Sequence, residues 1–263
     1  MSESALSADY VIIGAGIAGA SAAYWLAPYG RVIVLERETQ PGYHSTGRSA
    51  AQFMESYGSL QVRRLTRASR AFFMQPPAGF APHALIHPRS SLFVATTGQE
   101  DLLREQWELL RQTSPNLQRL DAAHACALFP VLQPDKVCGA LLDPDTCDMD
   151  VDALLQGFLR GVRQAGGQIV TQAEVKQMRR EKDGLWHVQS ADRTFIAPVV
   201  VNAAGAWADE IARLAGAEPL GLEPRRRSAF TFPVSEGMDT AAWPMAIGIA
   251  ENWYIKPDAG QLL

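Results

Sequence analysis

The chain has 263 residues, of which 47% are hydrophobic, and its 24 Lys and Arg against 28 Asp and Glu give a net charge of −4. This length predicts one large or two modest globular domains, and the weakly acidic balance gives no reason to expect nucleic acid or an anionic membrane as partner. No apolar run approaches the ~18 residues of an integral membrane segment, no signal peptide is recognisable, and three cysteines without CxxC spacing predict a reducing, cytoplasmic location.

Residues 10–37 carry the pattern of a strand, a tight turn, a helix and a second strand. The β-branched run at 10–13 leads into Gly14-Ala15-Gly16-Ile17-Ala18-Gly19, the G-x-G-x-x-G pattern. Its first glycine allows the turn, the second lets the backbone approach a pyrophosphate, and the third lets the helix predicted over 17–26 pack on the strand. Helix amides then point at the phosphates. Glu36 ends the second strand, where a carboxylate binds a ribose 2′-hydroxyl and repels a 2′-phosphate, which favours FAD or NAD over NADP.

The next segment, 41–51, is small, polar and Gly-containing, which suits a loop whose backbone lies close to a ligand. Ser45, Thr46 and Ser49 offer hydroxyls to phosphate or ribitol oxygens, and Arg48 offers a charge-assisted contact. An ordinary solvated turn is the alternative, and the position directly after the second strand favours the ligand.

Residues 59–142 have a different sequence pattern from the nucleotide-binding segments before them. We expect a helix over 59–74, with Leu65, Ala68 and Phe72 on one side and its arginines on a solvated face, rather than a membrane-surface helix. Prolines near His83 and His87 argue against a shared helical face and a metal site. Strands are expected at 91–96 and 137–142, with an amphipathic helix at 99–112.

The acid-rich stretch 143–152 lacks the glycine and terminal glutamate of an EF-hand, so we interpret it as a turn and a helix N-cap. A helix over 151–164 then leads to a strand at 168–171 that returns to the first sheet. An antiparallel meander is predicted at 175–179, 185–190 and 194–196, followed by an apolar strand at 198–202.

That strand ends in Ala203-Ala204-Gly205-Ala206-Trp207, a second small-residue turn that permits close approach to a cofactor before a helix at 208–214. Arg225-Arg226-Arg227 opens a strand predicted at 228–232. Alternation places Arg226 on one face of it and its two neighbours on the other. A last strand is predicted at 252–256.

In combination these motifs resemble the D-amino acid oxidase and glycine oxidase family of FAD enzymes, and within it the bacterial D-arginine dehydrogenases most closely. The resemblance runs from about Asp9 to the last residue and is carried by residues 14–19, 35–37, 41–51, 199–207, 224–230 and 254–260. It implies an α/β fold, with a Rossmann-like FAD-binding domain of the glutathione-reductase type interleaved with an antiparallel α+β substrate domain. We expect the FAD-binding domain at 1–82 and 148–215, and the substrate domain at 83–147 and 216–263.

The motifs and the resemblance together predict a set of cofactor contacts. These are Gly14, Gly16, Ala18, Gly19, Glu36, Arg37, Ser45, Thr46, Gly47, Arg48, Ser49, Ala50, Ala51, Gln52, Val175, Ala204, Gly205 and Trp207.

The resemblance also implies a substrate pocket lined by Tyr57, Arg226 and Tyr254, with Arg226 as a bidentate clamp for a carboxylate. In such enzymes the flavin carries the chemistry, so we assign no catalytic side chain and no metal. The expected reaction oxidises the Cα–N bond of a D-amino acid to an imino acid by hydride transfer to flavin N5, with an unknown electron acceptor.

Three positions depart from the arginine-specific pattern. Ser91 stands where those relatives have a glutamate for the substrate guanidinium, Gln52 replaces a histidine, and Met54 replaces a threonine. We therefore expect Ser91 to accompany a preference for neutral or apolar D-amino acids. Oxidation of glycine or sarcosine is the alternative of the same chemistry.

The chain stops at Leu263 inside an expected strand, whereas family members continue. The sequence analysis therefore predicts a fragment or a truncated product. A flavin-binding chain without turnover is the alternative function from a different class.

Overall fold

The computed structural model describes residues 5–191 and 193–263, which form two compact units. The first contains the described residues up to Ser49, Pro76–His83 and Asp150–Arg226, and the second contains Ala50–Gln75, Ala84–Met149 and Arg227–Leu263. The main difference from the expected boundaries is residues 50–75, which pack with the second unit. The reason is pairing: β4, Gln52–Phe53, is hydrogen-bonded to β9, Cys147–Met149.

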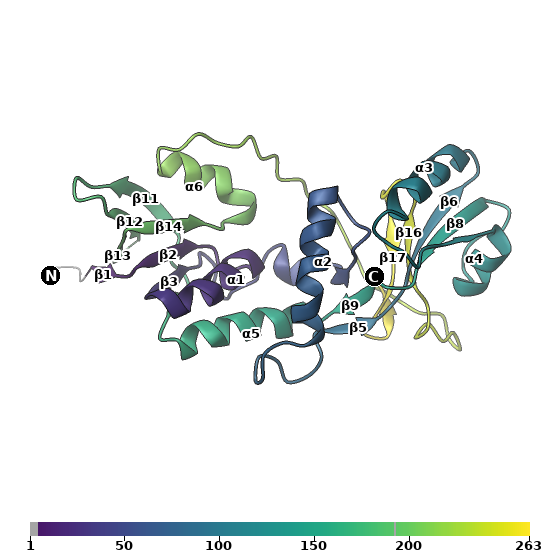
Figure 1. The fold of residues 1–263 in the computed structure, drawn as a ribbon, viewed down its shortest axis with the longest axis horizontal. Helices are drawn as coiled ribbons and strands as arrows, with labels where there is room; N and C mark the ends of the chain where they lie inside the picture. The colour runs from purple at the N-terminus through teal and green to yellow at the C-terminus, as the bar shows by residue number, and fades with distance from the viewer. Residues whose placement is uncertain (1–4, 192) are drawn as a thin grey trace. The chain divides into compact units, whose positions relative to one another are not determined.

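Apart from β1, a two-residue strand that was not predicted, the elements of the first unit each lie within a few residues of their expected place (Figure 1). They are β1 Leu6–Ser7, β2 Tyr10–Ile13, α1 Ile17–Leu26, β3 Val32–Leu35, α5 Val151–Gln164, β10 Gln168–Val170, β11 Val175–Arg180, β12 Trp186–Ser190, β13 Arg193–Ala197, β14 Val199–Asn202 and α6 Ala208–Leu214.

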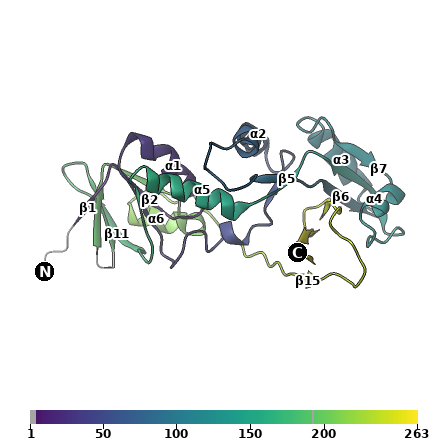
Figure 2. The same ribbon diagram turned by 90° about the horizontal axis from the view of Figure 1, so that it is seen from below.

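A parallel sheet in the order β10-β3-β2-β14 forms the middle of this unit. Successive strand residues point to opposite faces, so Val11 and Ile13 pack with the meander β11–β13 and α6, whereas Ile12 packs with α1 and α5. Both faces are thus covered, which explains the continuous apolar runs of β2 and β3. Figure 2 shows α1 and α5 side by side, and a Cβ on Gly161 of α5 would lie 2.4 Å from the Tyr24 ring.

The acid-rich stretch before α5 is a helix cap, as predicted. Asp150 accepts a hydrogen bond from the amide of Ala153 at 2.7 Å, and His83 Nε2 lies 2.7 Å from its other oxygen. These contacts, the amide first, lower the pKa of the Asp150 carboxyl. Asp150 therefore satisfies an α5 amide that would otherwise lack a partner.

Asp209 in α6 organises the chain beyond that helix. Its buried carboxylate accepts hydrogen bonds from the amides of Leu220, Gly221 and Leu222 at 2.8–3.0 Å. Burial raises the pKa of this carboxyl, but the three amides lower it by more, so the net pKa lies below its ordinary value. The charged form is therefore the one that the fold stabilises.

We expect Asp209→Asn to lower the urea midpoint at pH 7, because an amide oxygen replaces a charged acceptor. A lowered folded pKa gives stability that is present above the unfolded pKa of about 3.9 and lost as pH falls through the folded pKa. The difference between wild type and variant should therefore shrink from pH 7 to pH 3. Asp183→Asn, which affects an exposed carboxylate that accepts a hydrogen bond from the amide of Leu185, is the control. Equal midpoints at pH 7 would contradict this role.

The second unit is built on the sheet β17-β16-β6-β8-β7, with two helices against opposite faces. Phe93 and Ala95 of β6 pack with α3, and Leu92 and Val94 pack with α4. The elements of this unit are β4, α2 Leu60–Met74, β5 Ile86–Pro88, β6 Ser91–Thr96, α3 Glu100–Leu110, β7 Gln118–Leu120, α4 Ala122–Leu128, β8 Val137–Asp143, β9, β15 Phe232–Pro233, β16 Met245–Gly248, β17 Tyr254–Ile255, β18 Pro257–Asp258 and β19 Gln261–Leu262. None of the helices in the described part of the chain is long and apolar enough to cross a membrane.

Two expectations for this unit were wrong. Of the strand predicted at 228–232, residues 228–231 are irregular, and only Phe232, together with Pro233, pairs with β19. No other strand in the described part of the chain is hydrogen-bonded to this segment. In α2 the polarity is partly reversed. Leu65 is 70% exposed, whereas Arg63 is 6% exposed and its Nε donates to the Gly58 carbonyl at 2.9 Å. A side-chain hydrogen bond to a turn thus decides which face is buried.

Candidate dinucleotide-binding site

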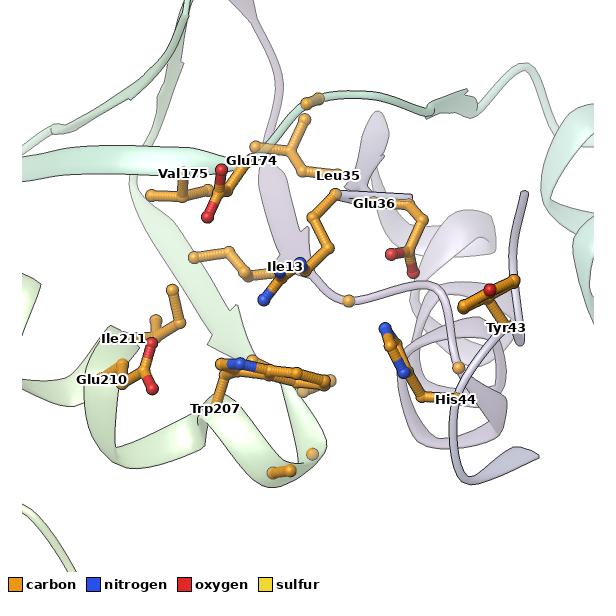
Figure 3. Close-up of a pocket in the computed structure, with 18 of the residues that line it drawn as sticks. Ile13, Leu35, Glu36, Tyr43, His44, Glu174, Val175, Trp207, Glu210 and Ile211 are labelled. Atoms are coloured by element: carbon orange, nitrogen blue, oxygen red, sulfur yellow. The ribbon is translucent and has the colours of Figure 1, made fainter. Parts of the chain in front are cut away.

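A cavity opens in the first unit where the parallel strands end. Gly14 follows β2, Glu36 follows β3, Ala173–Val175 follow β10, and Ala203–Trp207 follow β14, and all of them line the cavity. Because carboxyl ends of parallel strands share one edge of a sheet, four separate turns converge there. Figure 3 shows Glu36 and His44 on one side, Glu174 and Glu210 on the other, and the Trp207 ring between them.

Close contacts require glycine at two of the three motif positions, Gly14 and Gly19. Gly14 has a φ of +102°, and a Cβ there would lie 2.4 Å from the Ala203 carbonyl oxygen. A Cβ on Gly19 would lie 1.8 Å from the Gly14 carbonyl oxygen, so this glycine sets the packing of α1 on β2. At Gly16 the nearest atom would be Thr46 Oγ1, at 3.2 Å. The backbone at the start of α1 is therefore open to a ligand in the way a pyrophosphate requires.

Glu36 is 7% exposed and held by two amides. Ala15 N donates to its Oε2 at 2.9 Å, and Glu38 N donates to its Oε1 at 3.0 Å. A carboxylate has about four acceptor sites, so the side chain is fixed in place and still has capacity for ribose hydroxyls. This arrangement fits the role predicted from its place at the strand end.

The segment after β3 closes one side of the cavity. Gly16 provides no side-chain cap for α1, and Thr46 Oγ1 accepts a hydrogen bond from Ile17 N at 3.0 Å. Ser45 and Thr46 line the cavity, whereas Arg48 lies over the Tyr43 ring at 5.1 Å. A hydroxyl and main-chain amides at a helix N-terminus form a donor set suited to a phosphate.

The structure brings ten of the predicted cofactor contacts to this cavity. They are Gly14, Gly16, Glu36, Arg37, Ser45, Thr46, Val175, Ala204, Gly205 and Trp207. The lining does not include Ala18, Gly19, Gly47, Arg48 or Ser49, and Ala50, Ala51 and Gln52 belong to the second unit.

An aromatic and charged cluster at the cavity joins the predicted residues Arg37 and Trp207 to His44, which sequence reasoning missed. The guanidinium of Arg37 lies 4.6 Å from the centre of the Trp207 ring, and the His44 ring lies 4.6 Å from it. His44 Nε2 is also 2.8 Å from Glu38 Oε1. Flat aromatic and guanidinium faces suit the stacking of a base. Only the position of His44 within 41–51 could have indicated it, because the contact joins turns far apart in sequence.

The predicted substrate residues are distributed over the two units. Tyr254 is half-buried in β17 and lines a groove with Arg227, Phe230 and Trp253. Arg226 is an exposed residue of the first unit, and Tyr57 is 47% exposed in the second. Ser91 is fully buried, with its Oγ 3.0 Å from Thr146 Oγ1.

These features define a dinucleotide-binding α/β protein, with a glycine turn, a helix N-terminus and a strand-end carboxylate at one edge of a parallel sheet. Comparison with known families identifies the particular family within this class. The chain belongs to the DAO family, the FAD dependent oxidoreductases, whose family model matches residues 9–263. FAD is therefore the cofactor, and the glycine cradle and Glu36 fit its diphosphate and ribose.

Similar proteins include human mitochondrial dimethylglycine dehydrogenase, 25% identical over 236 residues, which cover 87% of this chain and 27% of that protein. Among solved structures, glycine oxidase from Geobacillus kaustophilus has a TM-score of 0.77 at 24% identity, over 98% of this chain and 70% of that one. FAD-bound L-alpha-glycerophosphate oxidase from Mycoplasma pneumoniae has a TM-score of 0.79 at 18% identity, over 97% and 70%. The chain thus spans about a quarter of the length of the dehydrogenase.

Proposed function

We propose that the protein containing this chain is an FAD-dependent oxidoreductase that oxidises the Cα–N bond of an amino acid to an imino acid. The observation that carries the proposal is the cavity at the strand ends, where Glu36 and the glycine cradle fit FAD in a chain of the FAD dependent oxidoreductase family. Bound FAD supplies the hydride acceptor. The two electrons leave with the Cα hydrogen, the amine loses a proton, and an acceptor of unknown identity reoxidises the flavin.

Different residues of the chain would bind the ribose, the diphosphate, the flavin and the substrate. Glu36 orients the ribose, and the diphosphate binds amides at the start of α1 other than those of Ala15 and Ile17, which donate to Glu36 and Thr46. Residues Ala50–Gln52 are proposed to contact the flavin on the strength of the family resemblance. Arg226 and Tyr254, with Tyr57, are proposed substrate contacts on the same ground, and the positive charge of Arg226 suits a carboxylate.

We further propose that the substrate is a neutral or apolar D-amino acid. Ser91 supports this preference, because a fully buried hydroxyl bonded to Thr146 offers no counter-charge to a cationic side chain. The particular likeness to D-arginine dehydrogenases stays a prediction. Three buried or half-buried free cysteines fit the proposed cytoplasmic location.

Glycine or an N-methylated glycine is the second candidate substrate. The substrates named for two similar proteins, a dimethylglycine dehydrogenase and a glycine oxidase, favour it. Both substrates need the same carboxylate contact and the same loss of hydride from the carbon beside nitrogen, so they differ only in what lies around Cα and nitrogen.

A substrate panel separates these candidates. We expect kcat/KM for D-alanine and D-methionine to exceed that for D-arginine by about tenfold or more, because a charge without a counter-charge is costly to desolvate. Arg226→Met should lower kcat/KM by about 100-fold, the value of a charge-assisted hydrogen bond. Arg225→Met is the matched control, because Arg225 pairs with Glu223 at 3.0 Å. D-Arginine as the best substrate would overturn the proposed preference, and sarcosine as the best would favour the second candidate.

A further inference from the structure

The cavity of the first unit has two sides with different chemistry. Gly14 and the start of α1 line one side with open backbone. Two carboxylates, those of Glu174 and Glu210, line the side opposite Glu36 (Figure 3). Because like charges repel, the side with the two carboxylates is unfavourable for a diphosphate, which is better placed at the glycine turn.

The covalent order of FAD decides what reaches the carboxylate side. The ribose of FAD belongs to its adenosine half and is bonded to the diphosphate through one carbon and to adenine through another. With the diphosphate at the glycine turn and the ribose at Glu36, the adenine extends toward Glu174 and Glu210. Val175 and the ring of Trp207 also line the cavity there, so the base has apolar and flat surfaces to pack on (Figure 3).

The two carboxylates differ in the contacts that they already make. Oε2 of Glu174 accepts a hydrogen bond from Nζ of Lys176, and this contact lowers the pKa of the Glu174 carboxyl. The carboxylate of Glu210 forms no hydrogen bond or ion pair with any residue in the described part of the chain. The next residue along α6, Ile211, is buried in the core of the unit and fixes the helix. Glu210 is therefore an acceptor without a donor, three residues after Trp207.

We propose that Glu210 selects adenine as the base of the dinucleotide by accepting a hydrogen bond from its exocyclic amine. The inference rests on the proposed function, in which FAD occupies this cavity. Adenine carries an N–H donor at position 6, where a 6-oxopurine such as hypoxanthine carries a carbonyl oxygen. A carboxylate attracts the donor and repels the carbonyl oxygen. One side chain thus binds the correct base and rejects the other.

The experiment compares the binding of FAD and of flavin hypoxanthine dinucleotide to the full chain after removal of its cofactor. Flavin fluorescence gives both dissociation constants, and the two ligands differ only in the group at position 6 of the base. We expect wild type to bind FAD about tenfold more tightly, the lower end of the value of a hydrogen bond to a charged group, because Glu210 is exposed. In Glu210→Gln the ratio should fall to about one, since an amide can either accept or donate.

Two further variants test the assignment to this residue. Glu174→Gln removes the carboxylate that Lys176 already engages and should keep the wild-type ratio. Glu218→Gln, at an exposed position of the same unit that does not line the cavity, is the matched control.

The outcomes separate this inference from the proposed function. Equal affinity of wild type for the two dinucleotides, or a ratio that falls in Glu174→Gln and not in Glu210→Gln, would overturn the inference and leave FAD binding standing. A wild-type ratio that persists in Glu210→Gln would overturn it as well. A wild-type chain that binds neither dinucleotide would overturn the proposed function and the inference together.

Discussion

Replacing Gly14 by Ala is expected to abolish FAD retention and to destabilise the first unit by about 4 kcal/mol. The estimate combines about 1–3 kcal/mol of backbone strain with about 1–3 kcal/mol for overpacking. The strain arises because φ is +102°, and the overpacking because the new Cβ would lie 2.4 Å from the Ala203 carbonyl oxygen. Neither neighbour can move freely, since Gly14 N donates to Leu35 O at 2.8 Å and Ala203 N donates to Ile13 O at 2.9 Å.

Gly79→Ala is the matched control for this prediction. Gly79 also has a positive φ, +76°, and belongs to the same unit, but a Cβ there would meet nothing within 4 Å. We expect a loss of about 1 kcal/mol and unchanged FAD content. FAD content is measured by absorbance after release from the protein, and stability by urea unfolding. A Gly14→Ala protein that keeps its FAD would show that the turn can rearrange to accommodate a Cβ. This result would contradict the close packing described above.

Replacing Glu36 by Ala is expected to weaken FAD binding by about 100-fold. The change removes the ribose acceptor and leaves the amides of Ala15 and Glu38 without their partner. An unsatisfied buried amide costs about 1–3 kcal/mol, so we also expect a loss of about 3 kcal/mol of stability. Ala15 is fully buried and has no access to water as a substitute.

The comparison with Glu36→Gln isolates the charge. Gln keeps an oxygen for one amide, so its effects on FAD affinity and stability should lie between those of wild type and Glu36→Ala. Glu181→Ala removes an exposed partner of Arg179 and should change stability by no more than about 1 kcal/mol. Fluorescence titration of the FAD-free protein with FAD gives the affinities. Equal affinity in all four proteins would mean that Glu36 does not face the ribose.

The nucleotide-binding elements could be predicted because local pattern and tertiary structure agree there. The apolar runs at β2 and β3, the glycine turn and the strand-end acid each carry a signal within a short window. The failed strand at 228–232 shows the limit. Alternation was present, but a strand also needs a neighbour, and the described chain offers one only to Phe232–Pro233.

The parts of the site that were missed depend on contacts between distant segments. His44 meets Trp207 across the cavity, and Lys256 meets Ala50 although 206 residues separate them. A single lysine between two short strands, β17 and β18, carries no sign in the sequence that its ammonium is buried. Similarly, Arg63 is buried by a hydrogen bond to the Gly58 carbonyl that helical periodicity does not encode. Such residues are found from geometry, after the fold has brought them together.

The most direct test of the account is the visible absorption spectrum of the purified protein before and after anaerobic addition of a neutral D-amino acid. The account predicts a flavin spectrum that bleaches on addition, because the chain holds FAD and the substrate delivers two electrons to it. A flavin spectrum that no amino acid bleaches would contradict the proposed oxidation and favour a binding protein without turnover. A colourless protein would contradict the central claim that the cavity at the ends of β2 and β3 holds FAD.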